Sequence, residues 1–100
     1  MQNHTKVYMN FFGYDISDTI LCEMCSAVAC DIHHIEKRNK TKNDYIENLI
    51  ALCRDCHINA ESDKSFNSYC RIQHLELVCV QVYALIDLNK KINENRKQIN

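Results

Sequence analysis

The sequence contains no proline, no tryptophan, a single glycine and only 8% aromatic residues. Without Pro-rich or Gly-rich stretches, repeats or low-complexity segments, nothing in it marks a linker between domains. We therefore expect one domain spanning residues 1–100. A chain this short with so few large side chains buries only a modest core, and such chains often need metal ions or disulfides to fold.

Long apolar runs are also missing. The longest contain four or five residues, as in LIALC, whereas a membrane-spanning helix needs about 20. The N-terminal segment MQNHTKVYMNFFGYD lacks the basic region and the apolar run of a secretory signal. The sequence therefore predicts a cytoplasmic protein, in a reducing compartment, that makes no contact with a membrane.

The chain has no excess of charge of either sign, because 12 basic and 13 acidic residues give a net charge of -1. A protein that binds polyanions over its whole surface would be basic throughout. Basic side chains gather locally instead. One group occupies a predicted loop and is made up of Lys37, Arg38, Lys40 and Lys42. The other, near the C-terminus, is interpreted as a solvated helix face: Lys90, Lys91, Arg96 and Lys97.

Hydrophobic periodicity and turn residues predict a small α+β fold. A short N-terminal helix over 7–12 is expected to end at Gly13, a residue that tolerates a left-handed C-cap. A hairpin knuckle at 20–25 is followed by a strand over 30–35 and a polar loop over 36–44. YIENLIAL then predicts a turn and a short strand, and RDCHINAE predicts the start of a helix, with Asp55 in its first turn.

A long C-terminal helix is predicted from Phe66 onward. Apolar residues recur there at spacings of three and four, which describes one helix face: Ile72, Leu75, Cys79, Val82 and Ile86. The β-branched run VCVQV leaves a strand open as an alternative. The expected boundaries are a core at about 18–64, an N-terminal helix at 5–13 and a helical extension at 65–95.

Seven cysteines raise a choice between disulfides, redox dithiols and metal ligands. Four of them form two CxxC pairs, Cys22 with Cys25 and Cys53 with Cys56. Two such pairs in a reducing compartment favour a structural zinc ion, because each pair places two thiolates on one side of a tetrahedral site. The other three are interpreted as small buried hydrophobic residues: Cys30, Cys70 and Cys79.

The segments around these cysteines resemble the HNH endonucleases of the zinc-supported ββα-metal (HNH/His-Me finger) type. The matching segments are CEMC, DIHHI, ENLIALC and RDCH, which cover 22–57 in the order and spacing of that family. The preceding FFGY is similar to small stand-alone members from phages and bacteria. The resemblance implies a metal-dependent DNA endonuclease that works in a bacterial or phage-infected cell.

Roles follow from the resemblance position by position. It implies that His34 is the general base, that Asn48 shapes the loop and orients the base, and that His33 and His57 bind the catalytic cation. A histidine suits the first task because its unperturbed pKa of about 6.5 lets it take a proton from water near neutral pH. Glu61 lies four residues after His57 on the same helix face, so it is a further candidate ligand, although a solvated glutamate is the commoner outcome.

The implied cofactors are a structural zinc ion and a second divalent ion for catalysis, which is Mg²⁺, Mn²⁺ or another transition metal. The basic group that begins at Lys37 is expected to hold flanking DNA phosphates. Many relatives carry glycines in this loop, whereas KRNKTKND has none, which leaves the path of the loop and its DNA contacts open.

Other interpretations stay open at this point. The chain can be a non-catalytic zinc-ribbon module that binds DNA or a protein, whose long helix pairs with a partner or with a second copy as a homodimer. His33 or His57 can also act as a zinc ligand in a larger, inactive zinc module. His4 and His74 are interpreted as structural, since a single histidine is more often structural than catalytic.

Overall fold

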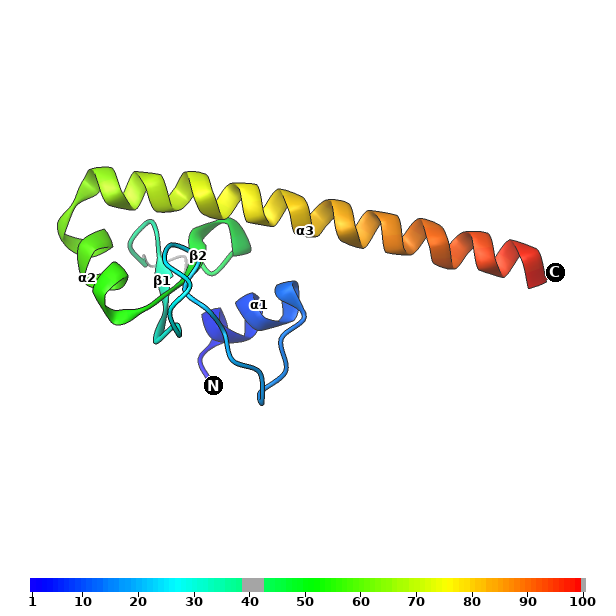
Figure 1. Cartoon of the computed structure of the whole chain (residues 1–100), viewed down its shortest axis with the longest axis horizontal. Coiled ribbons are helices and arrows are strands. Elements are labelled where there is room, and N and C mark those ends of the chain that lie inside the picture. Colours follow the sequence, from blue (N-terminus) through cyan, green and yellow to red (C-terminus); the bar gives the residue numbers. More distant parts are fainter. Residues whose placement is uncertain (39–42, 100) are drawn as a thin grey trace.

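A computed structural model describes residues 1–38 and 43–99 of the chain, without the side chains of 97–99 (Figure 1). The elements, in chain order, are α1 (Asn3–Phe12), β1 (Asp31–His34), the 3-10 helix η1 (Ile46–Asn48), β2 (Leu49–Leu52), α2 (Arg54–Ser62) and α3 (Lys64–Ile99). This arrangement confirms the predicted α+β class. Two members of the basic loop group, Lys40 and Lys42, lie outside the described residues.

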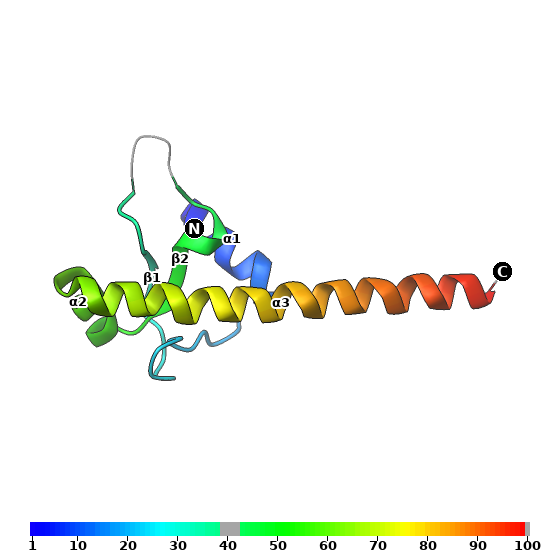
Figure 2. The same cartoon turned by 90° about the horizontal axis from the view of Figure 1, so that it is seen from above.

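The two strands pair antiparallel, with His33 opposite Ile50 and His34 opposite Leu49. Successive side chains of a strand point to opposite faces of the sheet. On one face, Ile50 and Leu52 pack with residues of α2 and α3, and on the other face Leu49 and Ala51 pack against α1. The sheet therefore lies between α1 and the α2–α3 pair, and α3 passes across it (Figures 1 and 2).

Local signals explain where the shorter helices begin and end. Gly13 ends α1 with a φ of 74°, the left-handed C-cap that glycine adopts without strain. Cys53 is the N-cap of α2, where its sulfur accepts from the backbone N–H of Cys56 at 3.5 Å. Asp55 lies in the first turn of α2, where a negative charge complements the helix dipole.

Helix α3 extends far beyond the rest of the molecule (Figure 1). The helix interpretation of VCVQV is confirmed, but the apolar face that the spacing describes is not the face that packs on the body. Cys70, His74 and Val78 face the body and are buried, whereas the apolar series that includes Ile72 and Val82 is largely exposed. Counting only apolar residues missed this face because a histidine stands at its centre.

The three cysteines outside the CxxC pairs also differ in burial. Cys70 is fully buried, as expected. Cys30 and Cys79 are exposed, so their interpretation as buried hydrophobic residues is wrong. Cys30 precedes the strand β1 at the border of a cavity, and Cys79 lies on the outer side of α3.

A buried polar network joins α3 to the rest of the fold. The Nδ1 atom of His74 lies 2.9 Å from a carboxylate oxygen of Glu23, and its Nε2 lies 2.6 Å from the carbonyl oxygen of Ile46. Tyr8 donates its hydroxyl to the same carboxylate at 2.7 Å. Both ring nitrogens of His74 therefore have an oxygen partner, and the contact with Glu23 ties the helix to the first cysteine knuckle.

Candidate active site

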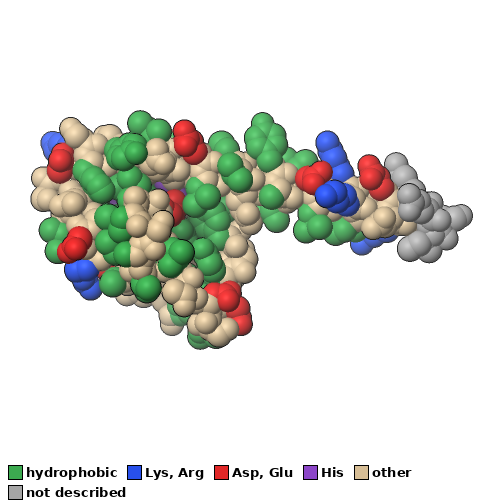
Figure 3. Space-filling view, viewed as in Figure 1, with side chains coloured by type: hydrophobic (Ala, Val, Ile, Leu, Met, Phe, Trp, Pro, Cys, Tyr) green, Lys and Arg blue, Asp and Glu red, His purple; other side chains and the backbone are tan. Residues whose placement is uncertain are grey.

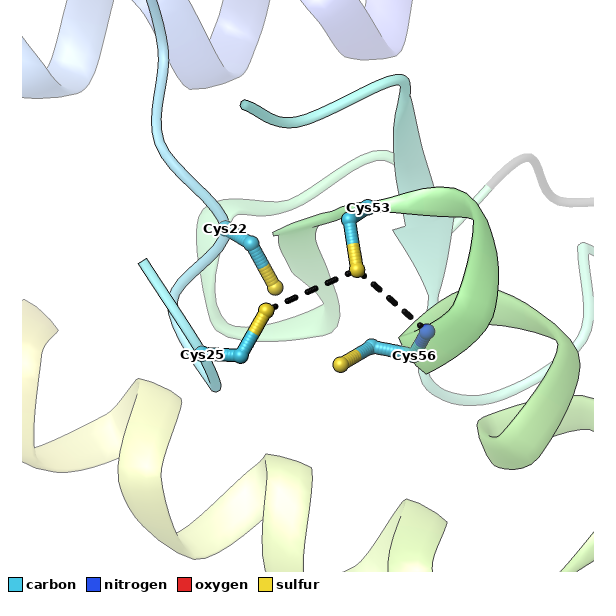
Figure 4. Close-up of side chains that lie close together, drawn as sticks. All are labelled: Cys22, Cys25, Cys53 and Cys56. Carbon is cyan, nitrogen blue, oxygen red and sulfur yellow. Dashed lines mark hydrogen bonds between the residues drawn. The ribbon is translucent and has the colours of Figure 1, made fainter. Parts of the chain in front are cut away.

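Four cysteines converge on one point (Figure 4). Cys22 and Cys25 come from the knuckle that is closed by the bridge between Leu21 and Val28, and the second pair comes from the start of α2. Their sulfur atoms all lie within 4.8 Å of one another, and those of Cys25 and Cys53 are 3.6 Å apart. A tetrahedral zinc ion with Zn–S bonds of about 2.3 Å needs sulfurs about 3.8 Å apart, so this group can hold zinc.

Electrostatics at the cysteines favour a bound cation. Although burial opposes it, backbone hydrogen bonds at Cys53, Met24 and Cys25 lower the pKa of Cys22 to about 7. Burial and the neighbouring thiols instead raise the pKa of Cys56. Four thiolates this close repel one another, and a dication at their centre removes that repulsion and keeps the sulfurs deprotonated.

A second group of potential ligands lies on the α2 side of the sheet and consists of His33, His57 and Glu61. The two imidazole rings are 4.9 Å apart between centroids, and Nε2 of His57 lies 3.0 Å from Oε1 of Glu61. Ligands bound at right angles at about 2.1 Å from a metal are about 3.0 Å apart, so this pair has the spacing of neighbouring ligands. His33 and His57 thus lie with Glu61 and not with the cysteines.

Two residues that the sequence did not indicate hold these histidines. Asp31 accepts from Nδ1 of His57 at 2.9 Å, which leaves Nε2 free to bind a metal. Asn67 of α3 contacts Nε2 of His33 through its Oδ1 at 2.9 Å and donates to the carbonyl of Ile35 at 2.8 Å. Strand alternation could have found Asp31, which shares a face with His33, but no local signal indicates Asn67, which is far away in sequence.

Burial lowers the pKa of His33 below its usual value, and the hydrogen bond that His33 donates to Asn67 only partly offsets that shift. The imidazole is therefore neutral at pH 7 and has a lone pair to offer a cation. The buried position of His33 and its partners thus favour a ligand over a surface histidine.

His34 points to the opposite face of the sheet, toward α1. Its Nε2 lies 2.7 Å from Oδ1 of Asp44, and the other oxygen of Asp44 accepts from the side chain of Asn3 at 3.1 Å. The hydrogen bonds from His34 and Asn3 lower the pKa of Asp44, which is therefore ionised at neutral pH. With Nε2–H donated to this carboxylate, His34 presents the lone pair of Nδ1. No motif in the sequence indicated Asp44.

His4 of α1 lies next to His34, with 4.8 Å between the ring centroids. Burial, followed by the charge of His34, lowers the pKa of His4. Its Nδ1 atom is buried and has no hydrogen-bond partner among the described residues. His4 therefore belongs to the surroundings of His34 and is not an isolated structural histidine.

Asn48 closes the loop between the strands and is fully buried. Its Oδ1 accepts from the backbone N–H of Glu36 at 2.7 Å, and its Nδ2 donates to the carbonyls of Glu36 at 3.1 Å and Asn43 at 3.2 Å. The amide thus joins the two ends of the loop. Because Asn43 directly precedes Asp44, these bonds also place the carboxylate that contacts His34.

One cavity of about 780 Å³ borders both histidine groups. His33, His57 and Glu61 line it, and so does His34, because the strand ends there and its edge is open. Three basic side chains also line this cavity: Lys37, Arg38 and Lys64. Lys64 is the first residue of α3 and was not indicated by the sequence.

Residues 22–63 match the family model described as HNH endonuclease. The matched segment contains both CxxC pairs, the two histidines of β1, Asn48 and the histidine of α2. No curated protein and no solved structure matches the chain. Among the described residues, every helix is too short or too polar to cross a membrane.

Proposed function

From the premise that residues 22–63 are an HNH endonuclease domain, we propose that the chain is a metal-dependent DNA endonuclease that hydrolyses phosphodiester bonds. One observation carries the proposal. His34, which is paired with Asp44, lies on one face of β1, and the group of His33, His57 and Glu61 lies on the other face. Both nevertheless border the same cavity. A phosphate in this cavity can therefore be approached by a base and by a cation from different directions.

His34 is the general base of the proposed reaction. Asp44 keeps the proton of the neutral ring on Nε2, so that Nδ1 takes the proton of the attacking water. The same carboxylate stabilises the imidazolium that results. Asn48 acts as a positioning residue, because it holds the loop end that carries Asp44.

His33, His57 and Glu61 are the proposed ligands of the catalytic cation. When bound, a divalent ion supplies positive charge to the phosphoryl oxygens and to the leaving 3′-oxygen, which leaves a 5′-phosphate product. Asp31 and Asn67 orient the two imidazoles, so the ligand set is arranged before the ion arrives. The four cysteines hold a structural zinc ion.

Lys37, Arg38 and Lys64 are the proposed phosphate contacts along the cavity. Such contacts fix the position of the DNA without reading its sequence. Lys40 and Lys42 extend the same loop and remain proposed contacts from the sequence, outside the described residues.

The test is the cleavage of supercoiled plasmid by zinc-loaded protein in Mg²⁺, Mn²⁺ and Co²⁺, with His34→Ala beside the wild type. Loss of the base is expected to lower the cleavage rate by about 10² to 10⁴ while zinc content, fold and DNA affinity are kept. Equal cleavage by both proteins would refute the assignment of His34. DNA binding without cleavage in any of these ions would favour the non-catalytic zinc-ribbon module.

A specific feature of α3 supports pairing of two copies of the chain. The side of the helix that packs on the body at Val78 continues beyond it as Leu85, Leu88 and Ile92, all of which are exposed. Figure 3 shows apolar side chains on this projecting part of the helix. Val78, Leu85 and Ile92 are spaced by seven residues, the repeat of a coiled coil. Light scattering on a sizing column tests this dimer: Leu88→Lys should give a monomer if the helices pair.

A further inference from the structure

The side-chain group around His34 contains a feature that the proposed reaction does not use. His4, His34 and Asp44 each offer one ligand atom, and these three atoms lie within 4.8 Å of one another. The Nδ1 of His4 is buried and unpartnered among the described residues. A buried polar nitrogen without a hydrogen-bond partner is unfavourable, so its presence beside two other ligand atoms points to something that binds there.

We propose that His4, His34 and Asp44 form a second site for a divalent ion of the zinc type, and that an ion bound there switches off His34. Two imidazoles and one carboxylate make a donor set that zinc favours. Three protein ligands leave the fourth position of a tetrahedral zinc ion open to a water molecule. The inhibitory consequence rests on the proposed role of His34 as general base, whereas the site itself does not.

The geometry is close to what such an ion needs. Tetrahedral ligands at about 2.0 Å from zinc are about 3.3 Å apart. His34 and Asp44 already approach each other at 2.7 Å, so most of the adjustment falls to His4. His4 lies in the first turn of α1, and no ligand separation exceeds the required one by more than about 1.5 Å.

Solvent reaches the group from two sides. His34 lines the cavity of about 780 Å³, and His4 lines a separate cavity of about 340 Å³ on the α1 side. Asp44, whose side chain is only 5% exposed, lies between the imidazole of His34 and the amide of Asn3. An ion can therefore enter without displacing the sheet or the core.

Inhibition follows from the single proton of the neutral His34 ring. In the metal-free arrangement Nε2 carries that proton, donates it to Asp44 and leaves Nδ1 as the basic nitrogen. An ion that binds Nε2 needs the lone pair of that nitrogen, so the ring proton moves from Nε2 to Nδ1. No proton is gained or lost overall, but the nitrogen that should accept from water is blocked.

The first arm of the test counts ions. Wild type, His4→Ala, His4→Gln and the neighbouring control Thr5→Ala are dialysed against the same free Zn²⁺ series, and bound zinc is measured by atomic emission. Wild type and Thr5→Ala should each bind one ion per chain more than the two His4 variants. Equal counts in all four proteins would overturn the second site.

The second arm measures plasmid cleavage in saturating Mg²⁺ at increasing free Zn²⁺. His4→Ala should cleave without zinc and need at least about 10-fold more Zn²⁺ for half inhibition than wild type does. Inhibition that excess Mg²⁺ relieves equally in both proteins would assign the effect to the group of His33 and overturn the proposal. If wild type cleaves no DNA in any ion, the proposed nuclease function fails, and the zinc count still decides the site.

A third measurement needs no variant and covers the case in which changes at His4 unfold the protein. The ring ¹⁵N resonances of the five histidines are followed by NMR during the Zn²⁺ titration of wild type. The ring nitrogens of His4 and His34 should shift together in one binding step. A titration in which only His33 and His57 respond would refute the second site.

Discussion

Replacing Asn48 with alanine should destabilise the zinc-loaded protein by about 3 to 5 kcal/mol. The amide makes three hydrogen bonds, of 2.7, 3.1 and 3.2 Å, at a position with 0% exposure. Each such bond contributes roughly 0.5 to 1.5 kcal/mol, and a buried group left without its partner is unfavourable by roughly 1 to 3 kcal/mol. The loss is therefore a large fraction of the roughly 5 to 15 kcal/mol that holds a domain together.

The assay is urea denaturation at a fixed free Zn²⁺ concentration, since bound metal contributes to apparent stability. Asn59→Ala is the matched control, because Asn59 is exposed on α2, and it should change the free energy of unfolding by less than about 0.5 kcal/mol. Asn48→Asp keeps the acceptor for Glu36 but places a carboxylate against two carbonyl oxygens, so it should also be destabilised. An Asn48→Ala protein as stable as Asn59→Ala would refute this reasoning.

Three further results are expected. Cys53→Ser should lose zinc and cooperative folding together, because structural zinc contributes roughly 10 to 16 kcal/mol, whereas the exposed Cys79→Ser should keep both, as measured by metal content and circular dichroism. Lys64→Ala should weaken DNA binding and lower the salt dependence by about one counterion, while Lys91→Ala, on the far part of α3, should not. The folded protein holds the pKa of His33 and His4 below 6.5, so the unfolded chain binds more protons as the pH falls below that value. Stability should therefore decrease there, and less so in the His4→Gln/His33→Gln double variant, as followed by urea denaturation from pH 7.5 to 5.5.

Sequence reasoning worked where a function depends on residues close together along the chain. The CxxC spacing predicted a four-cysteine group, and the sulfur atoms do converge. Gly13 predicted the end of the first helix, because only a residue without a side chain enters the left-handed C-cap freely. The fold also brings His33 and His57 together, as the resemblance implied, although their roles as ligands stay predictions.

The apolar periodicity did not identify the buried face of a helix where a polar residue lies at the centre of that face. The buried face of α3 is centred on His74, whose partners Glu23 and Ile46 are distant in sequence, and the apolar face through Ile72 is largely exposed. Cys79 was interpreted as buried because free cysteines behave as small hydrophobic residues, but it is exposed. A periodicity count cannot recognise a buried polar pair whose two members are distant in sequence.

The sequence alone indicated the cysteine group, the resemblance to HNH endonucleases and the neighbouring positions of His33 and His34, because these depend on short-range spacing. The partners that complete the two histidine groups are visible only in the tertiary structure. Asp44 and His4 reach His34 from the loop end and from α1, whereas Asn67 reaches His33 from α3. These contacts join segments that are separate along the chain, and the packing of α1 and α3 on opposite faces of the sheet brings them together.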